Sequence, residues 1–266
     1  MTGAARNTIT TLLVQLGTAC SGYQDRNLRN LTVRRIECDE IWSFCHAKAR
    51  NVPVERRGEF GYGDVWTWTA IDADTKLVPS WLVGMHEMAD ARAFMFDVRS
   101  RVVGRIQITT DGMHDYPAVI EQAFGTDADY AQLIKEYGVE ASWDASPTAR
   151  RYSPNKVTSS RVNVISGNPD PDLISTSIVE RQNLTMRMSM RRFTRLTNGF
   201  SKKVENHAAM VSLHFMHYNF ARPHSSLGKN VTPAMAAGVA DHVWTCDEIA
   251  ALLDPKPNAW ARIVRP

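Results

Sequence analysis

Hydrophobic and polar residues alternate in the first half of the chain in a way that predicts β-strands. The first alternating stretch keeps Arg35, Glu37 and Asp39 in one phase while its apolar residues do not, so this strand is expected to be partly buried on both faces. Two runs rich in aromatic and β-branched residues follow. The three predicted strands, which form an antiparallel meander, are 32–45, 62–71 and 76–85.

A helical period replaces the alternation after the third strand. Residues 89–103 place Phe94, Val98 and Val102 on one side, and the short strand 105–110 ends directly at Asp111. The order strand, strand, strand, helix, strand is that of a ribonuclease-H-like α/β sheet. The sequence therefore predicts a mixed sheet with flanking helices, in which strands 1–3 are antiparallel and strand 4 is parallel to strand 1.

The remaining segments divide the chain into three parts. Residues 1–31 contain an amphipathic helix and a linker; the helix resembles the DNA-reading helix of a helix-turn-helix, so we interpret it as a truncated motif or as a leading helix only. Residues 32–225 form the α/β domain, with an irregular insertion at about 125–176. Residues 226–266 form a helical tail, in which Thr232 is expected to cap a short helix.

Composition places the chain among ordinary globular proteins. Hydrophobic residues make up 44% and charged residues 22%, and the four cysteines form no CxxC pair. No apolar run approaches the length of a membrane span, so we expect a soluble cytoplasmic protein. The net charge of +3 is unevenly distributed, with basic residues concentrated near 25–35, 48–57 and 181–203.

Three acidic residues stand out by position. Asp39 lies in the first predicted strand, Asp111 ends the fourth, and Glu180 begins the helix predicted over 177–195. The carboxyl ends of adjacent parallel strands open into one crevice, to which a packed helix can add its own side chain. Clustered carboxylates repel one another unless a cation neutralises them, and such oxygen ligands select Mg²⁺ or Mn²⁺. A pair of such ions supports phosphoryl transfer.

The helix after Glu180 is strongly basic, which suggests contact with a phosphate backbone. On an ideal helix Glu180, Arg187 and Arg191 share one face, and Leu184 and Met188 are expected on a buried side. The alternative is a solvated basic helix with an acid favourable to its dipole. The predicted DNA-binding residues are Arg181, Asn183, Arg187, Arg191, Arg192, Lys202, Lys203 and Arg222.

Two neighbouring acids compete with this assignment. Glu37 shares a strand face with Asp39 and is the alternative candidate for its role. Asp72 follows a strand, but its AIDADTK context is typical of a turn capped by an aspartate side chain.

Five segments together resemble a known family, the DDE-type insertion-sequence transposases of the insertion-sequence-one-like group. These segments are CDEIWSF (38–44), TTDG with Tyr116 (109–116), IVERQNLTMR (178–187), HYNFARPHSSL (217–227) and TPAMAAG (232–238). The resemblance implies that Asp39, Asp111 and Glu180 are a metal-binding catalytic triad using Mg²⁺.

It also implies cleavage of double-stranded DNA at the terminal repeats of an element and strand transfer into target DNA. The protein is then expected to act as a homo-oligomer, associated with the nucleoid when bound to DNA. A nuclease of the same fold without strand transfer and a non-mobile DNA-binding relic are the alternatives.

Overall fold

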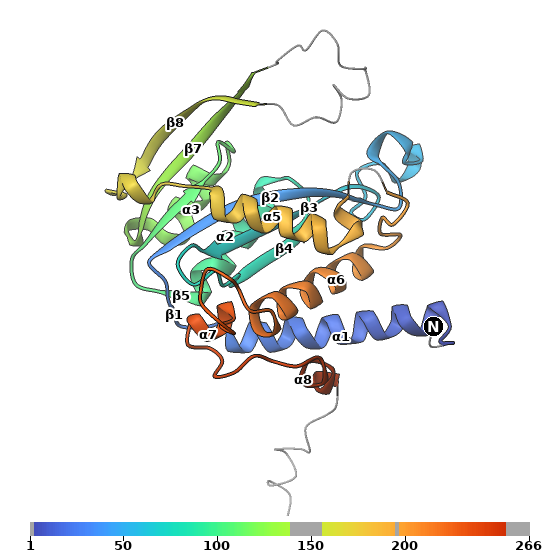
Figure 1. The fold of residues 1–266 in the computed structure, drawn as a ribbon. Coiled ribbons are helices and arrows are strands. Elements are labelled where there is room, and N and C mark those ends of the chain that lie inside the picture. Colours follow the sequence, from blue (N-terminus) through green and yellow to red (C-terminus); the bar gives the residue numbers. More distant parts are fainter. Residues whose placement is uncertain (1–2, 139–155, 195–196, 254–266) are drawn as a thin grey trace, which may run out of the picture.

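The computed structural model describes residues 3–138, 156–194 and 197–253. At its centre is a mixed sheet of six strands in the order β4-β3-β2-β6-β7-β8, with helices on both faces (Figure 1). The strands are β2 (Arg35–Cys45), β3 (Gly63–Asp72), β4 (Ser80–Gly84), β6 (Ile106–Thr110), β7 (Ala128–Gly138) and β8 (Lys156–Ser166). The α/β class and the mixed sheet are confirmed.

The four strands predicted from the sequence pair as expected. β2, β3 and β4 are antiparallel neighbours, and β6 lies parallel to β2. The strand order nevertheless differs from the prediction, because β7 and β8 extend the sheet beyond β6.

These two additional strands lie in the segment that was expected to be an irregular insertion, and that expectation is wrong for 128–138 and 156–166. β7 runs parallel to β6, and β8 returns antiparallel to β7. Every side chain from Val157 to Ile165 is exposed. The strand β8 is held by backbone hydrogen bonds to β7, and neither of its faces is buried. Its sequence therefore lacks the sustained alternation of apolar and polar residues that predicts a strand.

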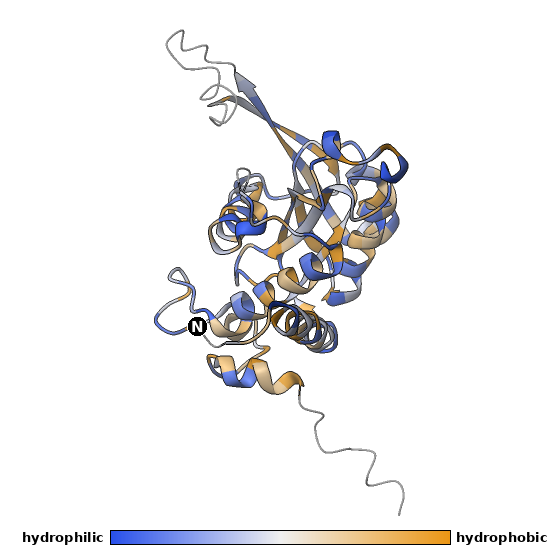
Figure 2. Ribbon diagram, turned by 90° about the vertical axis from the view of Figure 1, so that its right-hand side faces the viewer, coloured by the Kyte–Doolittle hydropathy of each residue, from blue (hydrophilic) through white to orange (hydrophobic). Residues whose placement is uncertain are grey.

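Two helices cover one face of the sheet. They are α2 (Met88–Arg101) and α3 (Tyr116–Phe124), and α2 follows the predicted helix 89–103 within two residues at each end. Phe94, Val98 and Val102 are buried, as predicted, in a core that also contains Trp68 and Tyr116. In Figure 2 hydrophobic residues lie mainly along the central strands and on the helix surfaces that face them.

Helices α5 (Ser177–Ser189) and α6 (Val204–Met216) cover the other face, where they share a second core with Ile41 of β2. The prediction for the buried side of α5 is wrong, since Leu184 and Met188 are 42% and 76% exposed. The buried residues of α5 are instead Val179, Gln182, Asn183 and Met186. Two of these are amides, because this side of α5 faces carboxylates on β2.

The helix α5 also ends earlier than predicted. Met190 is extended, and a short 3-10 turn follows over Arg191–Phe193. Arg191 is therefore not on a helical face shared with Glu180 and Arg187.

The N-terminal segment forms a single helix, α1 (Arg6–Asn27), so the linker expected over 19–35 is wrong for 19–27. α1 packs against α6 through small residues: a Cβ on Gly17 would lie 2.5 Å from the carbonyl oxygen of Ala209. The buried amide of Gln24 donates to the carbonyl of Ser212. Ile9 and Leu12, two residues of the predicted apolar stripe, remain about half exposed.

Short elements complete the described structure. β1 (Leu31–Thr32) pairs in parallel with β5 (Val102–Val103), and a π-helical turn (His217–Ala221) extends α6. α7 (Pro233–Ala236) begins at Thr232, whose hydroxyl accepts the N–H of Met235, so the predicted cap is confirmed. α8 (Cys246–Ala250) follows. Of the helices in the described ranges, none has the length and apolar character needed to cross a membrane.

Candidate metal centre

The register of two parallel strands places Asp39 beside Asp111. The β2–β6 ladder pairs Glu37 with Thr109, and each aspartate follows its strand's member of that pair by two residues. β6 ends just before Asp111, whose Oδ1 accepts the backbone N–H of Met113 at 3.0 Å. Both carboxylates therefore lie at the end of the sheet where parallel strands commonly form sites.

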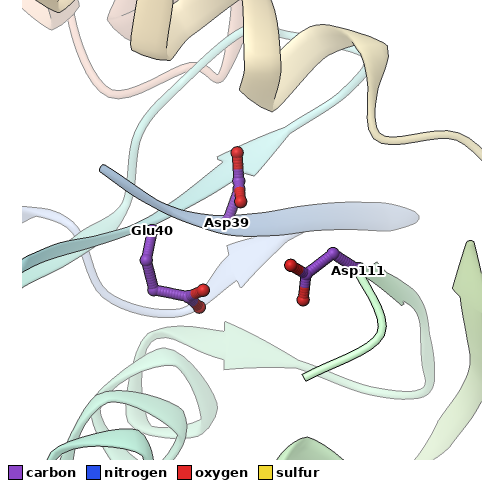
Figure 3. A group of neighbouring side chains, drawn as sticks. All are labelled: Asp39, Glu40 and Asp111. Carbon is purple, nitrogen blue, oxygen red and sulfur yellow. The ribbon is translucent and has the colours of Figure 1, made fainter. Parts of the chain in front are cut away.

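A third carboxylate, Glu40, joins these two. Each of the three residues Asp39, Glu40 and Asp111 has one carboxylate oxygen that lies within 4.8 Å of such an oxygen of the other two. Figure 3 shows Asp39 and Glu40 projecting from opposite sides of β2, with Asp111 reaching towards them from the end of β6. Because alternation assigns Glu40 to the opposite face from Asp39, adjacency in sequence was the only signal that could have identified it.

Glu40 contacts the buried Tyr116 and the exposed His86. The Tyr116 hydroxyl donates a hydrogen bond to Glu40 Oε1, and His86 Nε2 lies 3.8 Å from Glu40 Oε2. The His86 ring lies against Trp66 and Trp68, with centroid distances of 4.4 and 5.7 Å. The Glu40 carboxylate consequently has a fixed position, with its side chain 4% exposed.

The two aspartates of the cluster have no cationic partner among the described residues, whereas Glu40 has His86. Burial, together with the charges of Glu40 and Asp111, raises the pKa of Asp39 to about 7. Burial also raises the pKa of Glu40, while its hydrogen bond to His86 raises the pKa of that histidine. Within the described ranges, no lysine, arginine or histidine forms an ion pair with Asp39 or Asp111. Close oxygen donors without a counter-charge fit a divalent cation.

Glu180 lies in the same cleft but outside the cluster. A cavity of about 640 Å³ is lined by Asp39, Asp111 and Glu180 together. The Glu180 carboxylate pairs with Lys135 Nζ and accepts the Thr176 hydroxyl at 2.7 Å. The structure thus brings the three predicted acids into one cleft, with Glu180 at the rim and already paired.

Two polar residues fix α5 above this cleft. Glu37, 2% exposed, accepts the backbone N–H groups of Ile178 and Val179 at 2.8 and 3.0 Å, so its carboxylate caps the N-terminus of α5. Asn183 Nδ2 donates to Asp39 Oδ2 at 2.7 Å. Glu37, the alternative candidate for the role of Asp39, therefore orients the helix that carries Glu180.

The predicted DNA-binding residues fall into separate places. Asn183 is buried against Asp39, so its side chain belongs to the interior of the site. Arg181 and Arg222 are exposed, and Arg187 is partly buried. The other four line a hollow beside the N-terminal end of α1: Arg191, Arg192, Lys202 and Lys203.

Asp72 caps its own turn, as the sequence indicated. Its carboxylate accepts the backbone N–H of Asp74 and the hydroxyl of Thr75. It takes no part in the carboxylate cluster.

Comparison of the chain with protein-family models gave no match, and comparison with curated proteins gave none. The chemistry must therefore be inferred from the cleft itself. Three close carboxylates and a fourth at the rim can hold a divalent cation where an anionic substrate could reach it.

Proposed function

We propose that this protein is a DNA transposase that cleaves DNA at the ends of an insertion sequence and transfers the strands into target DNA. The observation that carries the proposal is the carboxylate cluster of Asp39, Glu40 and Asp111, with Glu180 in the same cleft. Neither aspartate of the cluster has an ion-pair partner among the described residues. The segments that resemble DDE-type transposases contain all four of these residues.

The sheet is compatible with a ribonuclease-H-like core. Strands β4, β3 and β2 are antiparallel, β6 is parallel to β2, and the acids lie where β2 and β6 adjoin. The antiparallel strand β8 is an extension of that core.

Each residue has a role that follows from its position. Asp39 and Asp111 would hold Mg²⁺ or Mn²⁺, with Glu40 as an additional oxygen donor. Asn183 orients Asp39, and Lys135 orients Glu180, which would be a ligand of a second cation. When bound, two such ions activate the attacking water or 3′-hydroxyl and stabilise the leaving oxygen of the phosphoryl transfer.

The substrate in this proposal is double-stranded DNA, both at the element's terminal repeats and in the target. Exposed Arg181 and Arg222 and the basic residues beyond α5 supply positive charge for the phosphate backbone. We expect the active form to be a homo-oligomer on DNA.

The test compares wild type, Asp111→Asn and Asp64→Asn on duplex DNA that carries the repeats flanking the gene. Asp64 is an exposed residue of β3 outside the cleft, so its variant controls for the loss of one charge. We expect cleavage and joining by wild type and Asp64→Asn in Mg²⁺ or Mn²⁺. We expect a loss of about a thousandfold in Asp111→Asn, since a ligand of the cation contributes several kcal/mol.

Two further results decide between the alternatives. Nicked DNA without joined products would identify a nuclease of the same fold. Mn²⁺ binding, measured by isothermal titration, should be lost in Asp111→Asn and kept in Asp64→Asn. A wild-type protein that neither binds Mn²⁺ nor cuts would overturn the proposal.

A further inference from the structure

A hollow of about 1030 Å³ lies between the first turns of α1 and the segment that joins α5 to α6. Its basic lining residues are Arg6, Arg191, Arg192, Lys202 and Lys203. An adjoining hollow of about 730 Å³ shares Arg191, Gly199 and Phe200 with it and adds Lys48 and Arg50. We call the two together the basic groove. Its elements meet at the end of the molecule marked by the N-terminus in Figure 1.

The cations of the basic groove have no acidic partner in the described part of the chain. No carboxylate is among the described residues that line either hollow, and none of its seven cations forms an ion pair with a described carboxylate. Arg192 donates to the hydroxyl of Ser201, and Lys202 lies 3.5 Å above the centre of the Phe200 ring.

Arginines elsewhere in the chain are arranged differently. Arg99, Arg101 and Arg105 each pair with an aspartate at 3.0 Å or less. The cationic side chains of the basic groove therefore repel one another, and a bound polyanion would reduce that repulsion.

The rest of the lining suits a phosphate backbone. The exposed face of α1 presents Asn7, Thr11 and Gln15 to the basic groove, and their hydroxyl and amide groups can donate to phosphate oxygens. The surface is concave and continues from one hollow into the next, so it fits the ridge of a rod-shaped polyanion better than the plane of an anionic membrane.

The basic groove is also separate from the carboxylate cleft, because their described linings have no residue in common. We propose that the basic groove is a docking track for the sugar–phosphate backbone of duplex DNA, distinct from the cleft where the strand is cut. Only the choice of DNA as the polyanion rests on the proposed function. Arg6, Lys48 and Arg50 belong to this track although they were not among the predicted DNA-binding residues.

The experiment measures binding of a fluorescein-labelled duplex of about 30 base pairs, with EDTA present so that no cation occupies the cleft, over a range of salt concentrations. Wild type is compared with the triple variant Arg191→Gln, Lys202→Gln, Lys203→Gln. The matched control is Arg26→Gln, Arg92→Gln, Lys229→Gln, which removes three exposed cations outside the basic groove.

The groove variant should bind at least tenfold more weakly at 0.1 M salt, and its plot of log affinity against log salt should lose about three units of slope, one for each phosphate contact. The control should stay within about threefold of wild type, because it changes only the net charge. Thermal unfolding of both variants checks that they are folded, and Arg6→Gln with Arg50→Gln tests the two ends of the track.

Equal losses in the groove variant and the control, or a loss in neither, would overturn the proposal. The proposal would also be overturned if the groove variant lost affinity for vesicles containing phosphatidylserine but kept its affinity for DNA, because the groove would then be a membrane contact.

The experiments distinguish a failure of the docking track from a failure of the transposase proposal. If wild type never cuts DNA but the groove variant loses affinity, the docking track stands and the transposase proposal fails. If wild type cuts DNA and the groove variant keeps its affinity, the transposase proposal stands and the docking track fails.

Discussion

The carboxylate cleft and the basic groove differ in charge and in how firmly their side chains are held. In the cleft, Asp39, Asp111 and Glu40 each have a fixed hydrogen-bond partner, respectively an amide, a backbone N–H and a tyrosine hydroxyl. In the groove, most of the cations are exposed and without such a partner. A small cation requires ligands at set distances, whereas a phosphate backbone is attracted by charge over a broad area. The two regions thus match two different kinds of ligand.

The buried residues that support the two regions also differ in charge. The cleft depends on an anion, because Glu37 caps the helix that carries Glu180. The wall of the groove depends on a neutral histidine: His207 lies between the hydroxyls of Ser201 and Ser43, at 2.9 and 3.3 Å. Since Arg192 already donates to Ser201, a charged His207 would place two cations on one hydroxyl. Lowering the pH would therefore remove a charge behind the cleft and add a charge behind the groove.

The largest expected effect distinguishes Glu180, at the rim of the cleft, from the three residues of the carboxylate cluster. We expect Glu180→Gln to slow DNA cleavage about a thousandfold, because several kcal/mol of cation-assisted catalysis would be lost. The affinity of the cluster for its own Mn²⁺ should change little, since Glu180 lies outside the cluster. Glu40→Gln should weaken Mn²⁺ binding by about ten- to a hundredfold. Isothermal titration and single-turnover cleavage measure the two quantities. Equal losses of Mn²⁺ affinity would show that Glu180 belongs to the same ligand set.

Lowering the pH should destabilise the fold around His207, the residue that supports the wall of the groove. Burial lowers the pKa of His207 to about 4, so between pH 6.5 and 4 the unfolded chain binds a proton that the folded protein does not. The contribution of neutral His207 to the free energy of unfolding is therefore fully present above pH 6.5 and is lost as the pH falls towards 4. This loss is about 3 kcal/mol for a fully buried histidine.

Urea unfolding at pH 7 and pH 4.5 measures this loss. In wild type His214 should add to it, because burial also lowers its pKa to about 4. His207→Gln should reduce the difference between the two pH values by about half, since two similar histidines contribute. An unchanged difference would contradict the assignment to His207.

Removing the charge behind the cleft should have a smaller effect. Glu37→Gln keeps an oxygen that can accept from Ile178 and Val179, but loses the negative charge at the N-terminus of α5. We expect a loss of about 1–2 kcal/mol in the free energy of unfolding and cleavage slower by about tenfold or more. The exposed residue Glu121 of α3 supplies the control Glu121→Gln, which should match wild type in both measurements. Unaltered cleavage in Glu37→Gln would mean that the capping does not position Glu180.

The affinity of the cleft for a cation should depend on pH. Because the pKa of Asp39 is raised to about 7, the cation must displace a proton below that pH. The affinity for Mn²⁺ should rise about tenfold per pH unit up to pH 7 and then level off. In the protein without a cation, this raised pKa stabilises the fold at low pH, and that contribution is lost as the pH rises through 7. Titrations at pH 5.5, 6.5 and 7.5 that gave one affinity would contradict this.

The strands, the two aspartates and Glu180 could be predicted because they leave local signals. Buried strands alternate or run apolar, as 62–71 does, and Asp111 marks the end of such a run. The helix α5 was detected, but its buried side was not, because that side carries the polar residues Gln182 and Asn183, of which Asn183 bonds to Asp39. The strand β8 left no alternation, since its described side chains are nearly all exposed.

The sequence by itself determined the types of chemical group: acids at the strand ends, a basic stretch after α5, and enough apolar residues for an α/β core. Only the tertiary structure decided which groups meet. The parallel register of β2 and β6 brought Glu40 into the cluster and left Glu180 at the rim. The packing of α1 on α6 brought Arg6 beside Lys202. These choices depend on contacts between residues far apart in the chain, and local periodicity contains no record of such contacts.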